Sequence, residues 1–214
     1  MPRFTALAVL SLVLLTACTE SKFRPPKREG PPALVVQRNA PRLWLMLKQE
    51  EQRRRYVSGG SRYRLGKVVT ETFYHFDLQA HDPQTTDLAW KRRLATVQDV
   101  TGGHNAQARI YGQEGDVVWL FLADQPVAVS ADDGGIVADR AMLEQRNPEL
   151  RDLIPKDSDF YAYDNGLVIT AADGRRVKVR AGDYKAEPYA PPSEDYFRNV
   201  QFMATRWNGG YRTG

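Results

Sequence analysis

Strand-like apolar runs joined by Asp-Gly or Asp-Pro turns recur three times along this chain, and this pattern restricts the fold more than any other feature. Glycine after aspartate accepts the positive φ of a tight turn, so the pattern predicts β-hairpins. The three units are Phe76 to Leu94 around Asp82-Pro83, Val127 to Leu143 around Asp133-Gly134, and Leu167 to Ala181 around Asp173-Gly174.

Other segments also favour strands. Tyr74, Phe76 and Leu78 alternate with polar residues, which is the period-two pattern of a half-buried strand. The range 117–122, VVWLFL, is apolar throughout and predicts a strand buried on both faces. Helical periodicity is scarce before the end of the chain. We therefore expect a mainly all-β fold.

Two short helices are expected among the strands. Asn147 precedes Pro148, an arrangement typical of a cap followed by proline at the first helical position, and the helix should reach Ile154. A second candidate begins at Ser193. Its apolar side chains share one face at helical spacing, which favours core packing over docking to a partner. They are Tyr196, Val200, Met203 and Trp207.

The apolar runs before the turns begin near residues 74, 127 and 167, at spacings of about 50 and 40 residues. One four-stranded propeller blade has this size. We expect a small, open or partial β-propeller of roughly three to four blades, with a β-sandwich as the alternative. Residues 207–214 offer no closing strand, so a C-terminally truncated fragment of a larger propeller protein is also considered.

The first unit resembles the repeat of quinoprotein (PQQ-like) propellers, through Asp77-Leu78, Asp82-Pro83, Thr85 and Trp90. The resemblance covers about half of the chain after the leader. The layout is also similar to Gram-negative lipoproteins with PQQ-like or WD40-like propeller repeats and no known activity. Quinoprotein dehydrogenases use adjacent cysteines and a metal site, whereas this chain has one cysteine. The resemblance therefore implies a fold without quinone catalysis.

The N-terminus has the form of an export signal. Arg3 is followed by an apolar run from Phe4 to Leu15. As a helix this run would rise about 18 Å, too short for a bilayer core of about 30 Å, so it predicts a signal peptide. Leu15-Thr16-Ala17-Cys18 resembles a bacterial lipobox, with an ordinary secretory signal as the alternative.

The lipobox resemblance implies a chain of modifications at one residue. Signal peptidase would cut between Ala17 and Cys18, and Cys18 would carry a diacylglycerol and an amide-linked fatty acid such as palmitate. Two or more acyl chains hold a protein on a membrane for long periods. Thr19 replaces the aspartate that retains such proteins at the inner membrane. The expected location is the outer membrane, facing the periplasm, with the inner membrane left open.

After the predicted signal peptide, the chain divides into a tether and a domain. Residues 18–41 contain five prolines and scattered basic residues, so we expect an extended, unpaired, lipid-anchored tether. Residues 42–214 should form the β-rich domain. Arg53, Arg54 and Arg55 are the only basic run, interpreted as a solvated surface turn with a secondary role near anionic lipid.

Composition and motifs provide no catalytic centre. Removing the leader lowers the net charge from +4 to +3, with acids and bases mixed, which disfavours nucleic-acid binding. His75, His81 and His104 lack the converging ligands of a zinc site. Asp157 and Asp164 miss the spacing of a calcium loop and suit turn capping. We expect no enzyme activity, no metal and no cofactor.

Three functions are weighed. The first is a non-catalytic interaction or scaffold module for another envelope protein, with Tyr184, Tyr189 and Tyr196 as aromatic anchors. The second is a small-ligand or glycan binder that uses Trp90 or Trp119 as a platform. The third is an unrecognised enzyme. Lipid bound through Cys18 and a possible envelope protein are the expected partners.

Overall fold

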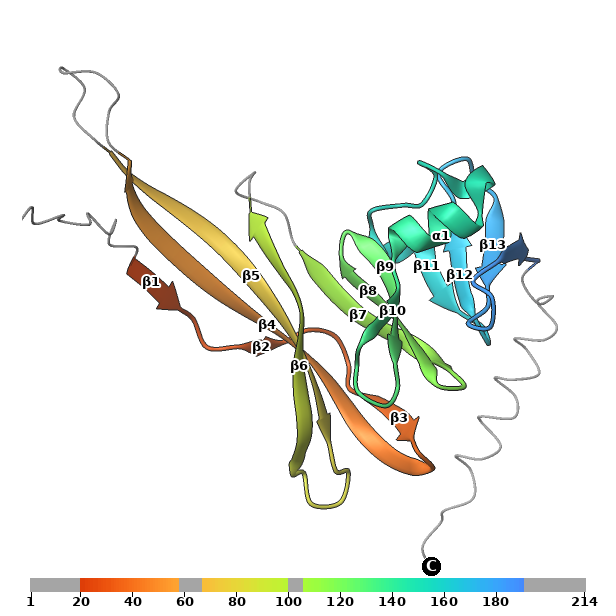
Figure 1. Cartoon of the computed structure of the whole chain (residues 1–214), viewed down its shortest axis with the longest axis horizontal. Coiled ribbons are helices and arrows are strands. Elements are labelled where there is room, and N and C mark those ends of the chain that lie inside the picture. The colour runs from red at the N-terminus through yellow and green to blue at the C-terminus, as the bar shows by residue number, and fades with distance from the viewer. Residues whose placement is uncertain (1–19, 58–66, 100–105, 191–214) are drawn as a thin grey trace, which may run out of the picture.

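The computed structural model describes residues 20–57, 67–99 and 106–190, which fold into three antiparallel sheets (Figure 1). We name them sheets A, B and C in chain order. The prediction of a mainly all-β protein is confirmed. The segments predicted beyond these ranges, including the helix from Ser193, lie outside the described residues.

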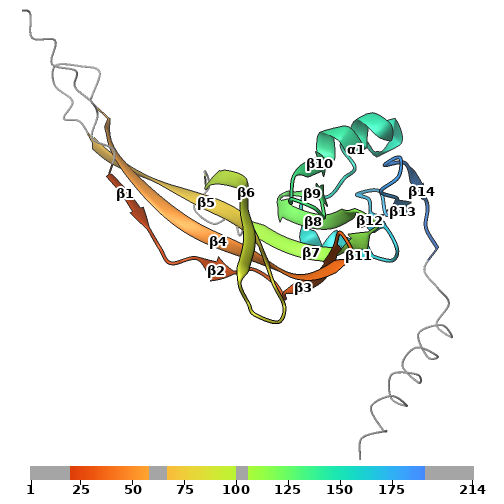
Figure 2. The same ribbon diagram turned by 60° about the horizontal axis from the view of Figure 1, so that its bottom comes forward.

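Sheet A is built on two long strands that pair over fifteen residues each. Their hairpin extends far beyond the other sheets (Figures 1 and 2). The central strands are β4 (Ala40–Val57) and β5 (Lys67–His81), followed by β6 (Leu88–Asp99). The other edge of β4 carries β1 (Glu20–Phe23), β2 (Lys27–Arg28) and β3 (Ala33–Gln37).

The predicted tether is therefore part of sheet A, and the prediction that residues 18–41 are unpaired is wrong for the described part. Glu20 pairs with Arg54, and Ala33 pairs with Trp44. Four of the five prolines, which cannot donate a ladder hydrogen bond, lie between the short strands and divide them, and Pro41 is the second residue of β4. The segment is extended as predicted, but β4 supplies its partners. No domain boundary falls at residue 41, because β4 begins at Ala40.

Sheet B is a four-stranded meander in the order β10-β9-β8-β7. The strands are β7 (Gln107–Glu114), β8 (Val117–Ala123), β9 (Gln125–Ser130) and β10 (Ile136–Ala138). Successive side chains of β8 face opposite sides of the sheet. Leu120 packs towards sheet A, and Trp119 and Phe121 pack towards sheet C. The prediction of a strand buried on both faces is confirmed.

Sheet C is a second four-stranded meander, in the order β11-β12-β13-β14. Its strands are β11 (Tyr161–Tyr163), β12 (Leu167–Thr170), β13 (Arg176–Val179) and β14 (Ala186–Pro188). Three short helices follow β10 and precede β11 in the chain. They are α1 (Arg140–Arg146), η1 (Pro148–Leu150) and η2 (Ser158–Phe160). The Asp139 carboxylate caps α1 by accepting from the Met142 amide at 2.9 Å.

The helix predictions were partly correct. Pro148 begins a short 3-10 helix as expected, but the helix ends at Leu150 and does not reach Ile154, and the Asn147 side chain does not cap it. Its amide donates to the carbonyls of Leu143 and Tyr184, and its oxygen accepts from Ala186. Asn147 thereby joins α1 to sheet C. Helix α1 was not anticipated and occupies part of the second predicted hairpin unit.

Two apolar cores join the three sheets in a row. One lies between sheets A and B and contains Trp44, Phe76 and Leu120. The other lies between sheets B and C and contains Trp119 and Ile169. Neither core joins sheet A to sheet C, so the described residues form open stacked sheets and no closed ring. Each predicted hairpin occurs, one per sheet, but a propeller is not established.

Candidate functional site

The residues predicted to carry chemistry are not gathered in one place. Cys18, Ala17 and His104 lie outside the described residues, so lipidation and cleavage stay predictions. The His81 imidazole Nδ1 contacts the Thr86 carbonyl at 3.0 Å, within the β5–β6 turn. Among the described residues, no group of three or more His, Cys, Asp or Glu side chains could hold a metal ion.

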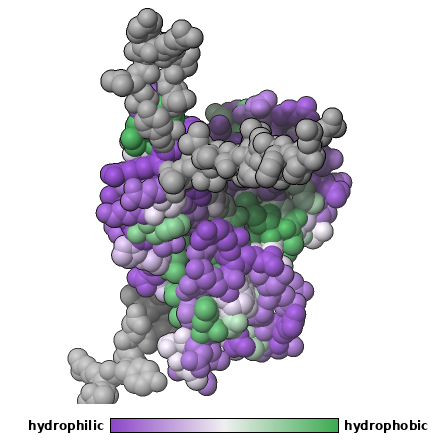
Figure 3. All heavy atoms as spheres, turned by 60° about the vertical axis from the view of Figure 1, so that its left-hand side comes forward, coloured by the Kyte–Doolittle hydropathy of each residue, from purple (hydrophilic) through white to green (hydrophobic). Residues whose placement is uncertain are grey.

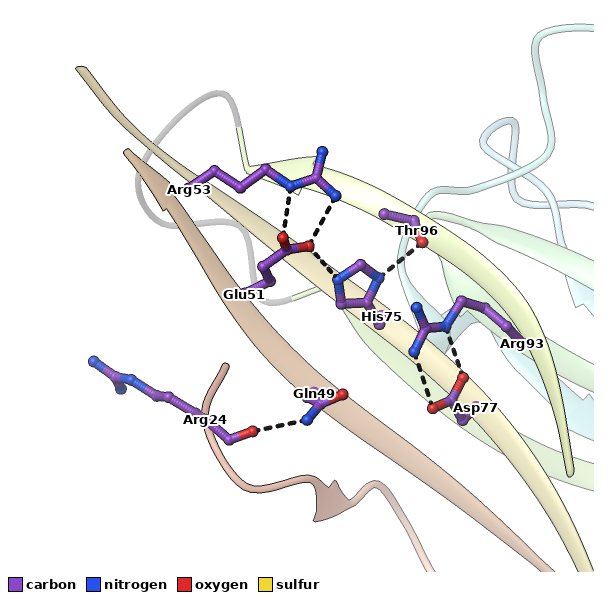
Figure 4. A network of polar contacts seen from close by, with 8 residues as sticks. All are labelled: Arg24, Gln49, Glu51, Arg53, His75, Asp77, Arg93 and Thr96. Atoms are coloured by element: carbon purple, nitrogen blue, oxygen red, sulfur yellow. Dashed lines mark hydrogen bonds and ion pairs between the residues drawn. The ribbon is translucent and has the colours of Figure 1, made fainter. Parts of the chain in front are cut away.

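The third histidine, His75, lies in a network of polar side chains on the outer face of sheet A, the face turned away from sheet B (Figure 4). Strand register creates this network. Residues at odd positions of β4 and β5 share the outer face, and β6 adds side chains beside them. The members are Glu51, Arg53, His75, Asp77, Lys91, Arg93 and Thr96.

His75 connects all three long strands. Its Nε2 lies 2.7 Å from a Glu51 carboxylate oxygen on β4, and its Nδ1 lies 2.9 Å from the Thr96 hydroxyl on β6. Both the histidine and the glutamate are buried, at 3% exposure each. Because an ionised carboxylate only accepts, Nε2 must carry hydrogen, which leaves Nδ1 of a neutral ring to accept from Thr96.

Arg53 holds Glu51 ionised. Its guanidinium donates twice to the carboxylate, at 2.7 and 2.9 Å, and it also lies over the Phe73 ring at 4.2 Å. The hydrogen bond from Arg53 is the main cause that lowers the Glu51 pKa to about 2, while burial opposes it. The interpretation of Arg53 as part of a solvated turn is wrong, because residues 53–55 lie within β4.

Asp77 is the second buried carboxylate of the network. Burial raises its pKa, but hydrogen bonds from Arg93 and Lys91, at 2.8 and 2.9 Å, outweigh burial, and the net shift is downward. Arg93 and Lys91 are both about half exposed. Arg93 and Lys91 replace the water that a buried carboxylate loses, and they stabilise the ionised form of Asp77.

The order hydroxyl, imidazole, carboxylate is that of a hydrolase triad, and the sequence analysis did not find it. The Thr96 hydroxyl, however, belongs to an exposed residue on the edge strand β6. Cavities of about 450, 290 and 270 Å³ open elsewhere and have other lining residues. A triad also needs oxyanion donors aimed at a bound substrate. We interpret the network as a clamp across β4, β5 and β6.

The largest of these cavities lies where the β2–β3 segment approaches β7, and it is polar. Lys48 within it donates to Glu29 and to the Ala106 carbonyl, both at 3.0 Å. Ser158 donates to the Gln107 side chain at 2.6 Å. These groups satisfy one another, which leaves few of them to bind a ligand.

The aromatic platforms proposed for a glycan are not available as predicted. Trp119 is fully buried, so its assignment as a platform is wrong. Trp90 is half-buried and meets Trp44 edge-on, with ring centroids 5.3 Å apart. Tyr184, an expected anchor, packs edge-on against Trp119, and Tyr189 lies against Lys178. Tyr196 lies outside the described residues.

The outer face of sheet A instead carries a group of apolar side chains at the end where Leu43 of β4 pairs with His81 of β5. Leu34, Val36 and Leu88 are 66%, 52% and 51% exposed. Cross-strand pairing brings Leu34 beside Leu43. The complete set, named the outer-face patch, is Leu34, Val36, Leu43, Leu45, Leu47 and Leu88.

Apolar groups on the surface of this protein occur as patches within polar surroundings, as the face drawn in Figure 3 shows. Patches of this kind often mark contact surfaces. The outer-face patch also has basic residues nearby on the same face. Arg28 pairs with Leu47, and Lys91 and Arg93 flank Asp77. The surface therefore combines apolar area with a small excess of positive charge.

No family model matches the chain, and neither the curated proteins nor the solved structures include a match. Among the described residues, the structure contains no helix with the length and apolar character needed to cross a membrane.

Proposed function

We propose that this protein is a periplasm-facing lipoprotein, anchored by acylated Cys18, whose β domain is a non-catalytic interaction module. The outer-face patch carries this proposal. Three of its aliphatic side chains are more than half exposed on a sheet face that no other described element covers. Burying them against a partner would remove apolar area from water, the main driving force of association.

The partner we propose is an envelope protein that presents an apolar segment flanked by acidic residues. Arg28, Lys91 and Arg93 contribute three positive charges near the patch, and Asp77 contributes one negative charge. Complementary charge increases the rate of association and selects among partners. The clamp around His75 keeps this face rigid, which reduces the entropy lost on binding.

Site-directed photocrosslinking tests the interaction. A photoreactive amino acid at Val36 should give one discrete protein adduct in intact cells, and the same group at Arg151, on the far side of the molecule, should not. Leu88→Ser should remove the adduct. Equal adducts from both positions, or none from Val36, would contradict the proposed interaction.

Lipid attachment is tested separately. The unaltered chain should incorporate radiolabelled palmitate and fractionate with membranes, whereas Cys18→Ser should lose the label. Labelling that persists in Cys18→Ser, or its absence from the unaltered chain, would disprove the anchor.

A further inference from the structure

The hairpin of β4 and β5 continues well beyond the core as a narrow arm (Figures 1 and 2). We name residues 20–23, 52–57 and 67–72 the distal arm. β6 ends where Asp99 pairs with Thr72, so beyond this point the arm consists of β4 and β5 with β1 along one edge. A ribbon this narrow has marginal stability in water, which favours a surface that supports it.

Positive charge is concentrated in this part of the chain. The distal arm contains five Lys or Arg and two Asp or Glu, a net charge of +3. The chain from Cys18 onward also has a net charge of +3, because the leader contributes only Arg3. All residues outside the arm together therefore carry no net charge. The arm is basic, and the rest of the protein is nearly neutral.

The arm also combines exposed cations with exposed apolar side chains. Lys22, Arg54 and Lys67 are exposed and form no ion pair within the described part of the chain. Val68 on β5 is 65% exposed and by strand register shares a face with Arg54 and Lys22. Phe23 on β1 is 53% exposed but lies on the opposite face, with its ring 6.0 Å from that of His75. Cations attract anionic headgroups, and small apolar groups enter the interface between headgroups and acyl chains.

The predicted anchor is close to the arm along the chain. Cys18 is two residues before Glu20, so their Cα atoms are at most about 7.6 Å apart whatever the conformation between them. Glu20 pairs with Arg54, three residues before the end of β4. Acyl chains on Cys18 would therefore enter the bilayer beside the arm. β1 fixes this proximity, which a flexible tether would not.

We propose that the distal arm lies against the anionic headgroups of the membrane that holds Cys18. This rests on the proposed lipid anchor and adds a second, electrostatic contact to it. The contact would orient the protein, with the arm at the membrane and sheets B and C held away from it. A lipid anchor alone leaves the orientation of the domain free.

A probe on the arm tests the contact. In the acylated chain, Val68→Cys adds a single free thiol, which can carry an environment-sensitive fluorophore. Its emission should shift to the blue on vesicles containing phosphatidylglycerol and not on pure phosphatidylcholine. About 1 M salt, where the Debye length is ~3 Å, should reverse the shift. The same fluorophore on Arg151→Cys should not respond.

Charge variants measure how much electrostatic attraction contributes to the arm contact. Each cation near the surface strengthens the contact about fivefold, so Lys22→Gln with Arg54→Gln, on the face that carries Val68, should weaken arm docking about 25-fold. Arg151→Gln with Lys185→Gln removes the same charge at the other end of the molecule and should leave docking unchanged. If both pairs weaken docking equally, binding depends on the net charge of the protein and not on the arm, and the proposal is overturned.

Failure of the arm contact and failure of the anchor are distinguishable. Protein that floats with vesicles and carries acylated Cys18, but shows no blue shift at Val68→Cys, contradicts the arm contact alone. Protein with unacylated Cys18, identified by mass spectrometry, contradicts the anchor. In that case a titration of Cys18→Ser carrying the Val68→Cys probe with anionic vesicles still measures the arm contact, because the expected shift and its loss in Lys22→Gln with Arg54→Gln do not require an acyl chain on the protein.

Discussion

His75 and Glu51, 24 residues apart in the chain, form a buried hydrogen bond of 2.7 Å between the two longest strands of the protein. Arg53 binds the same carboxylate from the solvent side. This hydrogen bond holds β4 to β5 on the outer face of sheet A, at a point between the outer-face patch and the distal arm.

The stability of the protein should depend on the ionisation of Glu51. Its pKa is lowered from 4.5 to about 2, so folding favours the carboxylate. The stabilisation is complete above pH 4.5 and is lost as the pH falls towards 2. Urea unfolding of Glu51→Gln should show a flatter pH dependence over this window than the unaltered protein. Identical slopes would show that Glu51 contributes no such linkage.

The Thr96 hydroxyl should contribute as a clamp. Thr96→Val removes the hydrogen bond to His75 and should lower the free energy of unfolding by about 0.5–1.5 kcal/mol. Thr70→Val is a matched control, because Thr70 is an exposed strand residue on β5. It should have almost no effect on urea unfolding. Loss of an esterase activity in Thr96→Val, with unchanged stability, would instead favour a catalytic triad.

Close packing of sheets B and C depends on a glycine. A Cβ on Gly112 would lie 2.5 Å from the Tyr163 ring, whose hydroxyl donates to the Gln113 carbonyl. Gly112→Ala should therefore cost about 1–3 kcal/mol through overpacking. Gly182→Ala meets no atom within 4 Å and should be nearly neutral. Thermal unfolding compares the two, and equal midpoints would contradict this packing.

Local signals predicted the parts of the fold that depend on local chemistry. Asp133-Gly134 and Asp173-Gly174 are turns, and the apolar run at 117–122 is a strand buried on both faces. The size of a repeat was a weaker guide. The spacing of repeats does not determine how the sheets pack against one another. A propeller was expected, but the described sheets form an open row.

Features that depend on long-range pairing could not be read in the same way. Prolines made residues 18–41 look like a tether, yet β4 is long enough to pair with the short strands between them. The link between Glu51 and His75 needs the register of β4 against β5, which no local motif specifies. The burial of Trp119, by contrast, follows from the prediction that 117–122 is a strand buried on both faces, and its assignment as a platform conflicted with that prediction.

The integration of residues 33–37 into the core gives a sharp last test. Val35 is 1% exposed and packs in the core between sheets A and B, whereas its neighbour Leu34 is 66% exposed. Val35→Ser should cost about 2–4 kcal/mol, because it leaves a cavity and buries a hydroxyl. Leu34→Ser should change the free energy of urea unfolding by less than about 0.5 kcal/mol. A flexible tether would make both substitutions neutral, and that result would contradict the pairing of β3 with β4.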